Sequence, residues 1–217
     1  MDGNFKYYSM VSSYQCIFVY TYFWRSDLRL FVFDVGGVIA ANTSVVPLIC
    51  EYLDIPTESF VDLVGPHSLH DLQRGRITVE SFVKLLSSKL AREVPLDIWE
   101  RFFHPSPIEE TLSIVRRLKK KYRVVSGTNT IVPHYAVHLE RGDYNIFDKT
   151  YASHIMGLAK PDHEFYRHIL AEEKCPAYES IFVDDTLKNV KAAKETGMIA
   201  IHFTEPSILE ERLKDFL

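Results

Sequence analysis

The most constraining feature of this 217-residue chain is a short apolar run that ends in an aspartate and two glycines. Residues 28–33 (Leu-Arg-Leu-Phe-Val-Phe) are typical of a buried strand in a parallel sheet, and Asp34 follows them directly. Gly36 and Gly37 indicate a tight turn that lets the backbone approach a ligand. Open α/β sheets bind ligands at the carboxyl ends of their strands, so Asp34 is a candidate functional residue. A structural cap on the turn would use the same carboxylate.

Three further segments place polar residues next to a strand end or a helix start. They are Ser126-Gly127 after residues 122–125, Lys160 before a helix expected to start at Pro161, and Asp184-Asp185 after residues 181–183. Carboxylates are ligands that Mg²⁺ prefers. A serine hydroxyl can hold phosphoryl oxygens, and a lysine offsets their charge. The sequence therefore predicts a site for a phosphate group and a metal ion.

In this order the four segments resemble the four motifs of the haloacid dehalogenase-like hydrolases, over residues 28 to about 203. The combination is specific: Lys160-Pro161-Asp162, Asp184-Asp185, Asn189-Val190, Ala192-Ala193 and Gly197-Met198. The resemblance is greatest to a subgroup that includes a bacterial glucose-1-phosphate phosphatase and the phosphatase domain of soluble epoxide hydrolases. It implies an α/β fold, with a Rossmann-like parallel sheet core and a small helical cap inserted after the first strand.

The resemblance also implies a function, an Mg²⁺-dependent phosphatase that acts through an aspartyl-phosphate on a small phosphorylated metabolite such as a sugar phosphate. Asp34 would be the catalytic nucleophile. The implied metal ligands are Asp34, the Gly36 carbonyl and Asp185, with Asp184 bound more remotely or through water. The implied phosphate-binding residues are Ser126, its neighbour Gly127, and Lys160, which is also catalytic.

Two positions depart from the family pattern. Most phosphatases of the superfamily carry a second aspartate where this chain has Gly36, and that residue protonates the leaving group. General acid-base help is worth about 10²–10⁴ in rate, so we expect a preference for good leaving groups such as sugar 1-phosphates, aryl phosphates and acyl phosphates. Gly127 stands where we expect the usual asparagine after Ser126. These departures keep two alternatives open: a catalytically weak protein that binds phosphate ligands, and a phosphotransferase or mutase.

Residues 42–104 lie between the first two motifs, where the family places its cap. Their pattern predicts four helices: residues 47–53, 57–64, 78–91 and 96–103. We expect this cap to act as a substrate-selecting lid on a core of residues 28–41 and 105–217. The polar stretch 67–76 is interpreted as a solvated loop. Alternatively it faces the substrate, with His70 and Arg74 in contact with it. Residues 106–109 (Ser-Pro-Ile-Glu) fit a helix capping box.

Composition fits one α/β core with a small accessory domain, since 47% of residues are hydrophobic. A net charge of −4 does not favour nucleic acid as a partner, and the basic cluster 116–121 fits a helix C-terminus. Three scattered cysteines, Cys16, Cys50 and Cys175, show no disulfide or metal spacing, which favours a reducing cytosol. The pattern predicts no oligomeric state.

The first 27 residues are rich in aromatic side chains and precede the first expected strand. Their apolar part is shorter than the roughly 20 residues that a membrane-spanning helix needs. A packed extra segment, a signal peptide without a clear cleavage site, and a start codon placed too far upstream all remain open.

Overall fold

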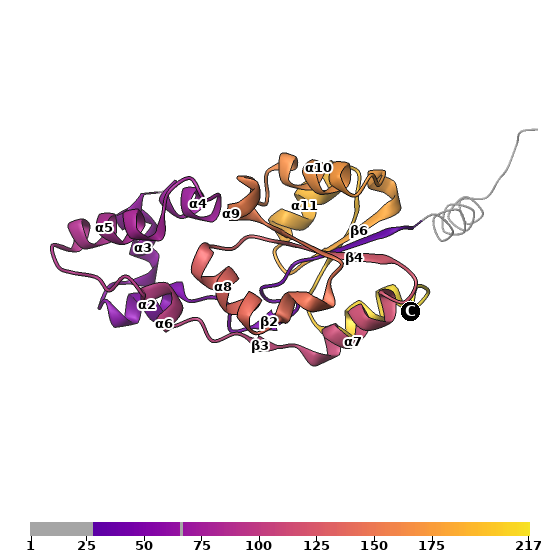
Figure 1. The fold of residues 1–217 in the computed structure, drawn as a ribbon, viewed down its shortest axis with the longest axis horizontal. Coiled ribbons are helices and arrows are strands. Elements are labelled where there is room, and N and C mark those ends of the chain that lie inside the picture. The colour runs from indigo at the N-terminus through magenta and orange to yellow at the C-terminus, as the bar shows by residue number, and fades with distance from the viewer. Residues whose placement is uncertain (1–27, 66) are drawn as a thin grey trace, which may run out of the picture.

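The computed structural model describes residues 28–65 and 67–217. Its centre is a five-stranded parallel sheet in the order β5-β4-β1-β6-β7 (Figure 1). The strands are β1 (Leu30–Phe33), β4 (Arg123–Thr128), β5 (Lys149–Ala152), β6 (Ser180–Asp184) and β7 (Ile199–His202). The expectation of an α/β fold with a Rossmann-like parallel sheet is confirmed. The expected N-terminal segment lies outside the described residues.

Helices cover both faces of the sheet, as parallel crossovers require. The helices of the core are α7 (Glu109–Leu118), α8 (Val132–Glu140), α9 (Ser153–Met156), α10 (His163–Glu172), α11 (Leu187–Glu195) and α12 (Pro206–Leu213). The described residues also include three short 3-10 helices, at Thr57–Ser59, Asp143–Ile146 and Ala177–Glu179. Side chains alternate along β1, so Phe31 and Phe33 pack toward α7 and α12, whereas Val32 packs toward α10 and α11.

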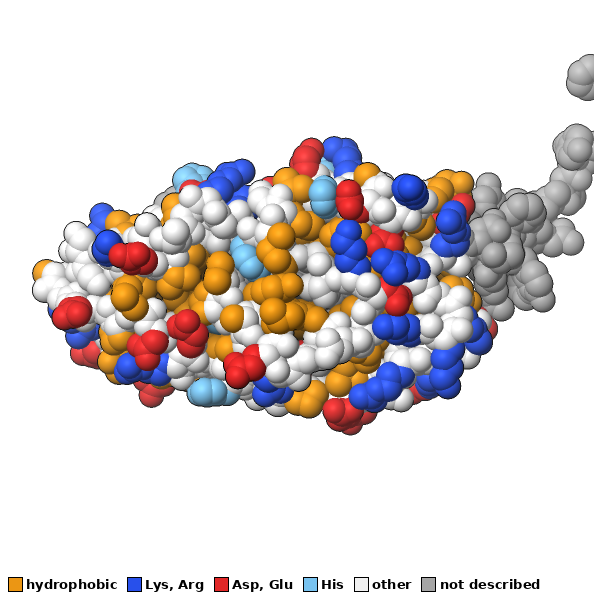
Figure 2. Space-filling view, viewed as in Figure 1, with side chains coloured by type: hydrophobic (Ala, Val, Ile, Leu, Met, Phe, Trp, Pro, Cys, Tyr) orange, Lys and Arg blue, Asp and Glu red, His pale blue; other side chains and the backbone are white. Residues whose placement is uncertain are grey.

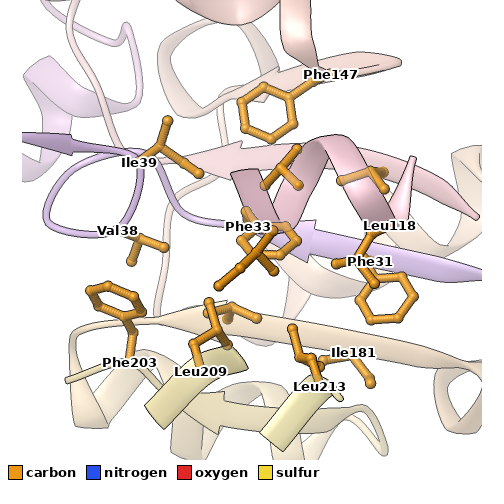
Figure 3. Close-up of a cluster of buried hydrophobic side chains, with 14 of the residues drawn as sticks. Phe31, Phe33, Val38, Ile39, Leu118, Phe147, Ile181, Phe203, Leu209 and Leu213 are labelled. Carbon is orange, nitrogen blue, oxygen red and sulfur yellow. The ribbon is translucent and has the colours of Figure 1, made fainter. Parts of the chain in front are cut away.

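The hydrophobic cluster on the α7 and α12 side fixes the end of β1. Phe33 lies in its middle, with Leu118 of α7 and Leu209 of α12 nearby (Figure 3). Phe33 is fully buried, and burial of such a side chain stabilises a fold by about 1.5–3 kcal/mol. The residue that follows Phe33 is therefore held at a rigid strand end.

Five helices between β1 and α7 form a unit that we call the cap. They are α2 (Val46–Tyr52), α3 (Phe60–Val64), α4 (Ser68–Gln73), α5 (Val79–Leu90) and α6 (Ile98–Arg101). They pack around their own hydrophobic cluster, in which the ring of Phe82 lies 6.3 Å from Phe60 and 5.5 Å from Trp99. The cap lies at the end of the molecule opposite the C-terminus (Figure 1). Its four expected helices are present, with the second divided into a 3-10 turn and α3.

Two sequence expectations near the cap were wrong. The polar stretch 67–76 is not a loop, because Leu72 is buried in the cap cluster and Leu69 packs against it, which orders α4. Residues 106–109 form no capping box. Ser106 instead belongs to β3 (Ser106–Pro107), which pairs antiparallel with β2 (Ala40–Ala41), and its hydroxyl accepts from Asn42 Nδ2 at 3.1 Å. The two chain crossings between cap and core thus run side by side.

The basic cluster at the end of α7 is engaged in ion pairs. Arg116 pairs with Glu109, Arg117 with Glu210, and Lys119 with Asp148. Figure 2 shows positive and negative side chains interspersed toward this end of the molecule. Cys50 and Cys175 are free thiols and buried. Within the described ranges, no helix combines the length and apolar character needed to cross a membrane.

Candidate active site

Three carboxylates meet at the carboxyl ends of two adjacent strands. Asp34 follows β1, whereas Asp184 ends β6 and Asp185 comes next. The β1–β6 register pairs Phe33 with Val183, so the aspartates that follow are neighbours. One oxygen from each carboxylate lies within 4.8 Å of the others. The sequence prediction that these three residues converge is thus matched by their placement.

Lys160 lies between two of these carboxylates. Its Nζ is 2.8 Å from Asp34 Oδ1 and 2.7 Å from Asp184 Oδ2, and its side chain is 1% exposed. Asn129 holds the Lys160 backbone on both sides, accepting from its amide at 2.8 Å and donating to its carbonyl at 2.9 Å. The ammonium is therefore fixed against Asp34 by contacts at both ends of the lysine.

The buried carboxylate of Asp184 is already surrounded by donors. Besides Lys160 it accepts from the Thr186 amide at 2.8 Å and from Asn189 Nδ2 at 3.0 and 3.1 Å. Asp184 is thus suited to orient its neighbours rather than to hold a ligand directly. The Oδ1 atom of Asn189 is buried and has no partner among the described residues.

The local charge is unbalanced, with three carboxylates around one ammonium. Burial, reinforced by the charge of Asp184, raises the pKa of Asp34 to about 7, although Lys160 opposes this rise. The same two causes raise the pKa of Asp185. The carboxylates raise the pKa of Lys160 in spite of its burial, so it stays protonated. A divalent cation would balance the remaining two negative charges.

The glycine turn after Asp34 packs closely against the Asp185 carboxylate. No described donor bonds to the Gly36 carbonyl, since the turn is closed by bonds to Val35 and Ala40 instead. A side chain at Gly37, whose φ is +74°, would collide with the Asp185 carboxylate. At Gly36 a Cβ would lie 3.0 Å from Thr43 Oγ1. The turn therefore fits the predicted set of metal ligands: Asp34, Asp185 and the Gly36 carbonyl.

A cavity of about 780 Å³ opens above this cluster, between core and cap. Its core side includes Asp34, Lys160, Asp185 and Asn129. Its far side is largely polar and is lined by Asn42, Thr43, Ser44, Leu69, His70 and Gln73. The substrate-facing alternative for the polar stretch is thus favoured for His70. Arg74 does not line this cavity, and its Nη2 is 2.5 Å from Asp162 Oδ2 instead.

Comparison with known proteins decides the family. The sequence model of the haloacid dehalogenase-like hydrolase family matches residues 28–197 of this chain. The chain belongs to this family. The sesquiterpene phosphatase astK of Aspergillus oryzae is 30% identical over 182 residues, which are 80% of this chain and 89% of that protein. The D-ribitol-5-phosphate phosphatase of Bacteroides thetaiotaomicron is 29% identical over 186 residues, with 78% and 89% covered.

Solved structures of this hydrolase family share the fold. An enzyme of the family from Bacteroides thetaiotaomicron, solved in complex with magnesium and inorganic phosphate, superposes with a TM-score of 0.68 at 22% identity, and 82% of this chain and 94% of that chain are covered. A hydrolase of the family from Porphyromonas gingivalis gives 0.72 at 23% identity, with 87% and 98% covered.

The second motif of this haloacid dehalogenase-like hydrolase lies later in the chain than the sequence analysis placed it. Ser126 is fully buried opposite Phe33, and its hydroxyl donates to Thr150 Oγ1 at 2.9 Å. A Cβ at Gly127 would lie 3.1 Å from Ile169, so this position faces the hydrophobic core. Neither residue lines the cavity. Strand β4 continues three residues further than expected, to Thr128.

Thr128 and Asn129 occupy the strand end that the prediction assigned to Ser126 and Gly127. Thr128 is the last residue of β4, and Asn129 lines the cavity and binds the Lys160 backbone. The asparagine that seemed to be missing from the motif is therefore Asn129. A threonine followed by asparagine carries the same pattern of hydroxyl and amide, and this was the sequence signal that we missed.

Replacing Gly37 by alanine is expected to weaken metal binding. The left-handed backbone alone costs a non-glycine residue about 1–2 kcal/mol, and the new methyl group must also displace Asp185. Gly157→Ala is the matched control, because Gly157 has φ +72° but no atom within 4 Å of its added Cβ. Thermal unfolding and Mg²⁺ titration of both variants test this. Equal loss of Mg²⁺ affinity in both variants would show that the close approach of Gly37 to the Asp185 carboxylate has no specific role in metal binding.

Proposed function

We propose that this protein is an Mg²⁺-dependent phosphomonoesterase that works through an aspartyl-phosphate on Asp34. The observation that carries the proposal is the Asp34 carboxylate held at 2.8 Å from the Lys160 ammonium, beside Asp185 and at the floor of the cavity. A carboxylate nucleophile divides one difficult displacement into two easier ones. Phosphatases among the relatives support the same conclusion.

Each residue of the site has a task in this proposal. Asp34 attacks phosphorus, while Lys160 and Asn129, which line the cavity, bind the phosphoryl oxygens in place of Ser126 and Gly127. Thr128 precedes Asn129 at the buried end of β4 and does not line the cavity. Mg²⁺ would be held by Asp34, Asp185 and the Gly36 carbonyl, and it would offset the charge of the phosphoryl group. Asp184 holds Lys160 and Asn189 in position. A structural neighbour was solved in complex with magnesium and inorganic phosphate, the two groups that this proposal places at the site.

The lining of the cavity favours a small hydroxylated leaving group. The two relatives are named for different substrate classes: one is a sesquiterpene phosphatase and the other a phosphatase of a polyol phosphate, D-ribitol 5-phosphate. Among the side chains above the site, Leu69 is the one large hydrophobic group, whereas Asn42, Gln73 and their neighbours offer hydrogen bonds. A C15 hydrocarbon gains binding energy from contact with large apolar side chains, of which this lining offers one, Leu69. We therefore place polyol and sugar phosphates before terpenyl phosphates.

In the same proposal the cap of residues 42–104 selects the substrate over a core of residues 28–41 and 105–217. Arg74 supports this role indirectly, since its pairing with Asp162 joins α4 to the core beside Lys160. A second contact, from Ser153 Oγ to the Gln73 carbonyl at 2.7 Å, joins the same helix to α9. The closed arrangement keeps the polar face of α4 over the site.

Phosphate release from a panel of phosphomonoesters, with Mg²⁺ and with EDTA, tests the proposed function. We expect release that depends on Mg²⁺, with polyol or sugar phosphates cleaved better than farnesyl phosphate. Tight binding without release would favour a phosphate-ligand-binding protein. Transfer of phosphate to a second sugar without release would favour a mutase. Full activity in excess EDTA would contradict the metal requirement.

A further inference from the structure

His70 reaches the cavity from α4 with one ring nitrogen already in use. Arg74, one helical turn later, has Nη1 2.9 Å from His70 Nδ1. A guanidinium group can only donate, so Nδ1 accepts, and the proton of the neutral ring is on Nε2. Among the described residues, none accepts a hydrogen bond from Nε2. His70 therefore offers a free N–H group to whatever occupies the cavity.

The surroundings of His70 keep its ring neutral and polarised. Burial lowers the pKa of His70, and Arg74 and Lys188 lower it further, whereas Asp162 acts in the opposite direction. Arg74 is itself held by Asp162, and its side chain is 9% exposed. A cation at Nδ1 draws electron density from the ring, which makes the Nε2–H group a stronger donor. The chain Asp162–Arg74–His70 thus aims a fixed donor from the cap.

Two residues after Asp34 the site has no side-chain donor, because Gly36 has no side chain. Resting on the phosphatase function proposed above, we propose that His70 donates a hydrogen bond from Nε2 to the leaving-group oxygen of the substrate. Asp34 forms a bond to phosphorus as the bond to this oxygen breaks. The electron pair stays on the departing oxygen, which takes its proton from water, and His70 remains neutral. Arg74 is a positioning residue that fixes the tautomer.

The leaving group decides how much this hydrogen bond contributes. Removing one donor to a developing oxyanion costs about 10²–10³ in rate in other enzymes. A phenolate needs little stabilisation, whereas an alkoxide needs much. We therefore expect His70→Leu to lower the ratio of kcat/KM for alkyl over aryl phosphates at least tenfold. His70→Gln places an amide donor near the position of Nε2 and should recover most of that ratio.

The matched control is His67→Leu. His67 lines a neighbouring surface hollow together with His70 but does not line the cavity over the site, so the ratio should change less than twofold. Two-bond nitrogen-proton NMR correlations of the His70 ring give an independent measurement. They should show the Nε2–H tautomer in the wild type and a mixture in Arg74→Met.

Three results separate the possible outcomes. A ratio in His70→Leu within twofold of the wild type would overturn the role of His70 and leave the phosphatase function standing. An Nδ1–H tautomer in the wild type would overturn it even if the variants fail to fold. Wild-type protein that releases phosphate from neither class of ester in Mg²⁺ would overturn both proposals.

Discussion

Replacing Asp34 by asparagine is expected to abolish phosphate release and to leave the fold intact. Asparagine has nearly the same shape as aspartate but cannot attack phosphorus, and loss of a nucleophile in a covalent mechanism costs about 10³-fold or more. Asp34 is 8% exposed and its pKa is raised, so the fold already accommodates an uncharged group there. We expect an unfolding temperature at least as high as that of the wild type in EDTA.

Steady-state hydrolysis of p-nitrophenyl phosphate measures the effect, with mass spectrometry of the variant to exclude deamidation back to aspartate. Ser126→Ala is a useful comparison, because Ser126 is buried and bonds to Thr150 rather than lining the cavity. Its effect on turnover should be far smaller than that of Asp34→Asn. If Asp34→Asn turns over close to the wild-type rate, Asp34 is not the nucleophile.

Removal of the metal is expected to have an effect of similar size, and metal binding should depend on pH. A carboxylate ligand must be deprotonated to bind Mg²⁺, whereas metal-free Asp34 has a pKa of about 7. The apparent affinity for Mg²⁺ should therefore fall by about tenfold per pH unit below pH 7. Asp185→Ala should weaken binding at every pH, because it removes a ligand rather than a proton.

The same pKa predicts the sign of a stability change. A carboxyl group whose pKa is raised by folding stabilises the metal-free protein at low pH, and this contribution is lost as the pH rises through 7. Mg²⁺ should thus raise the unfolding temperature more at pH 8 than at pH 6. Calorimetric titration in two buffers of different ionisation enthalpy measures the protons released, which should disappear in Asp34→Asn. Proton release that persists in that variant would assign the raised pKa to another group.

Local chemistry was sufficient to predict the part of the site that lies on β1 and β6. An apolar run that ends in an aspartate defines both a buried strand and its carboxyl end, so Asp34, Asp184 and Asp185 could be placed together from the sequence. Lys160 was recognisable by its Lys-Pro-Asp context. The parallel sheet was expected from the resemblance to the family and from the buried character of residues 28–33.

The errors came from places where tertiary packing decides the outcome. Ser126 could be mistaken for the strand end because Gly127 usually marks a turn, yet here it is a strand residue that lets Ile169 approach. The helix α4 was missed because its polar residues outnumber the two leucines that anchor it. Strand β5 was missed because its sequence, Lys-Thr-Tyr-Ala, has no apolar run. Contacts between cap and core leave no pattern in the sequence.

The pairing of Arg74 with Asp162 connects the cap directly to the segment that carries Lys160. Asp162 is two residues from Lys160 in the chain, and those residues tie a cap helix at one end to Asp34 at the other. A lid that swings open must release Asp162, and the adjoining peptide then loses one of its restraints. In the proposed mechanism, the position of Lys160 against Asp34 would then depend on Asn129 and Asp184 alone.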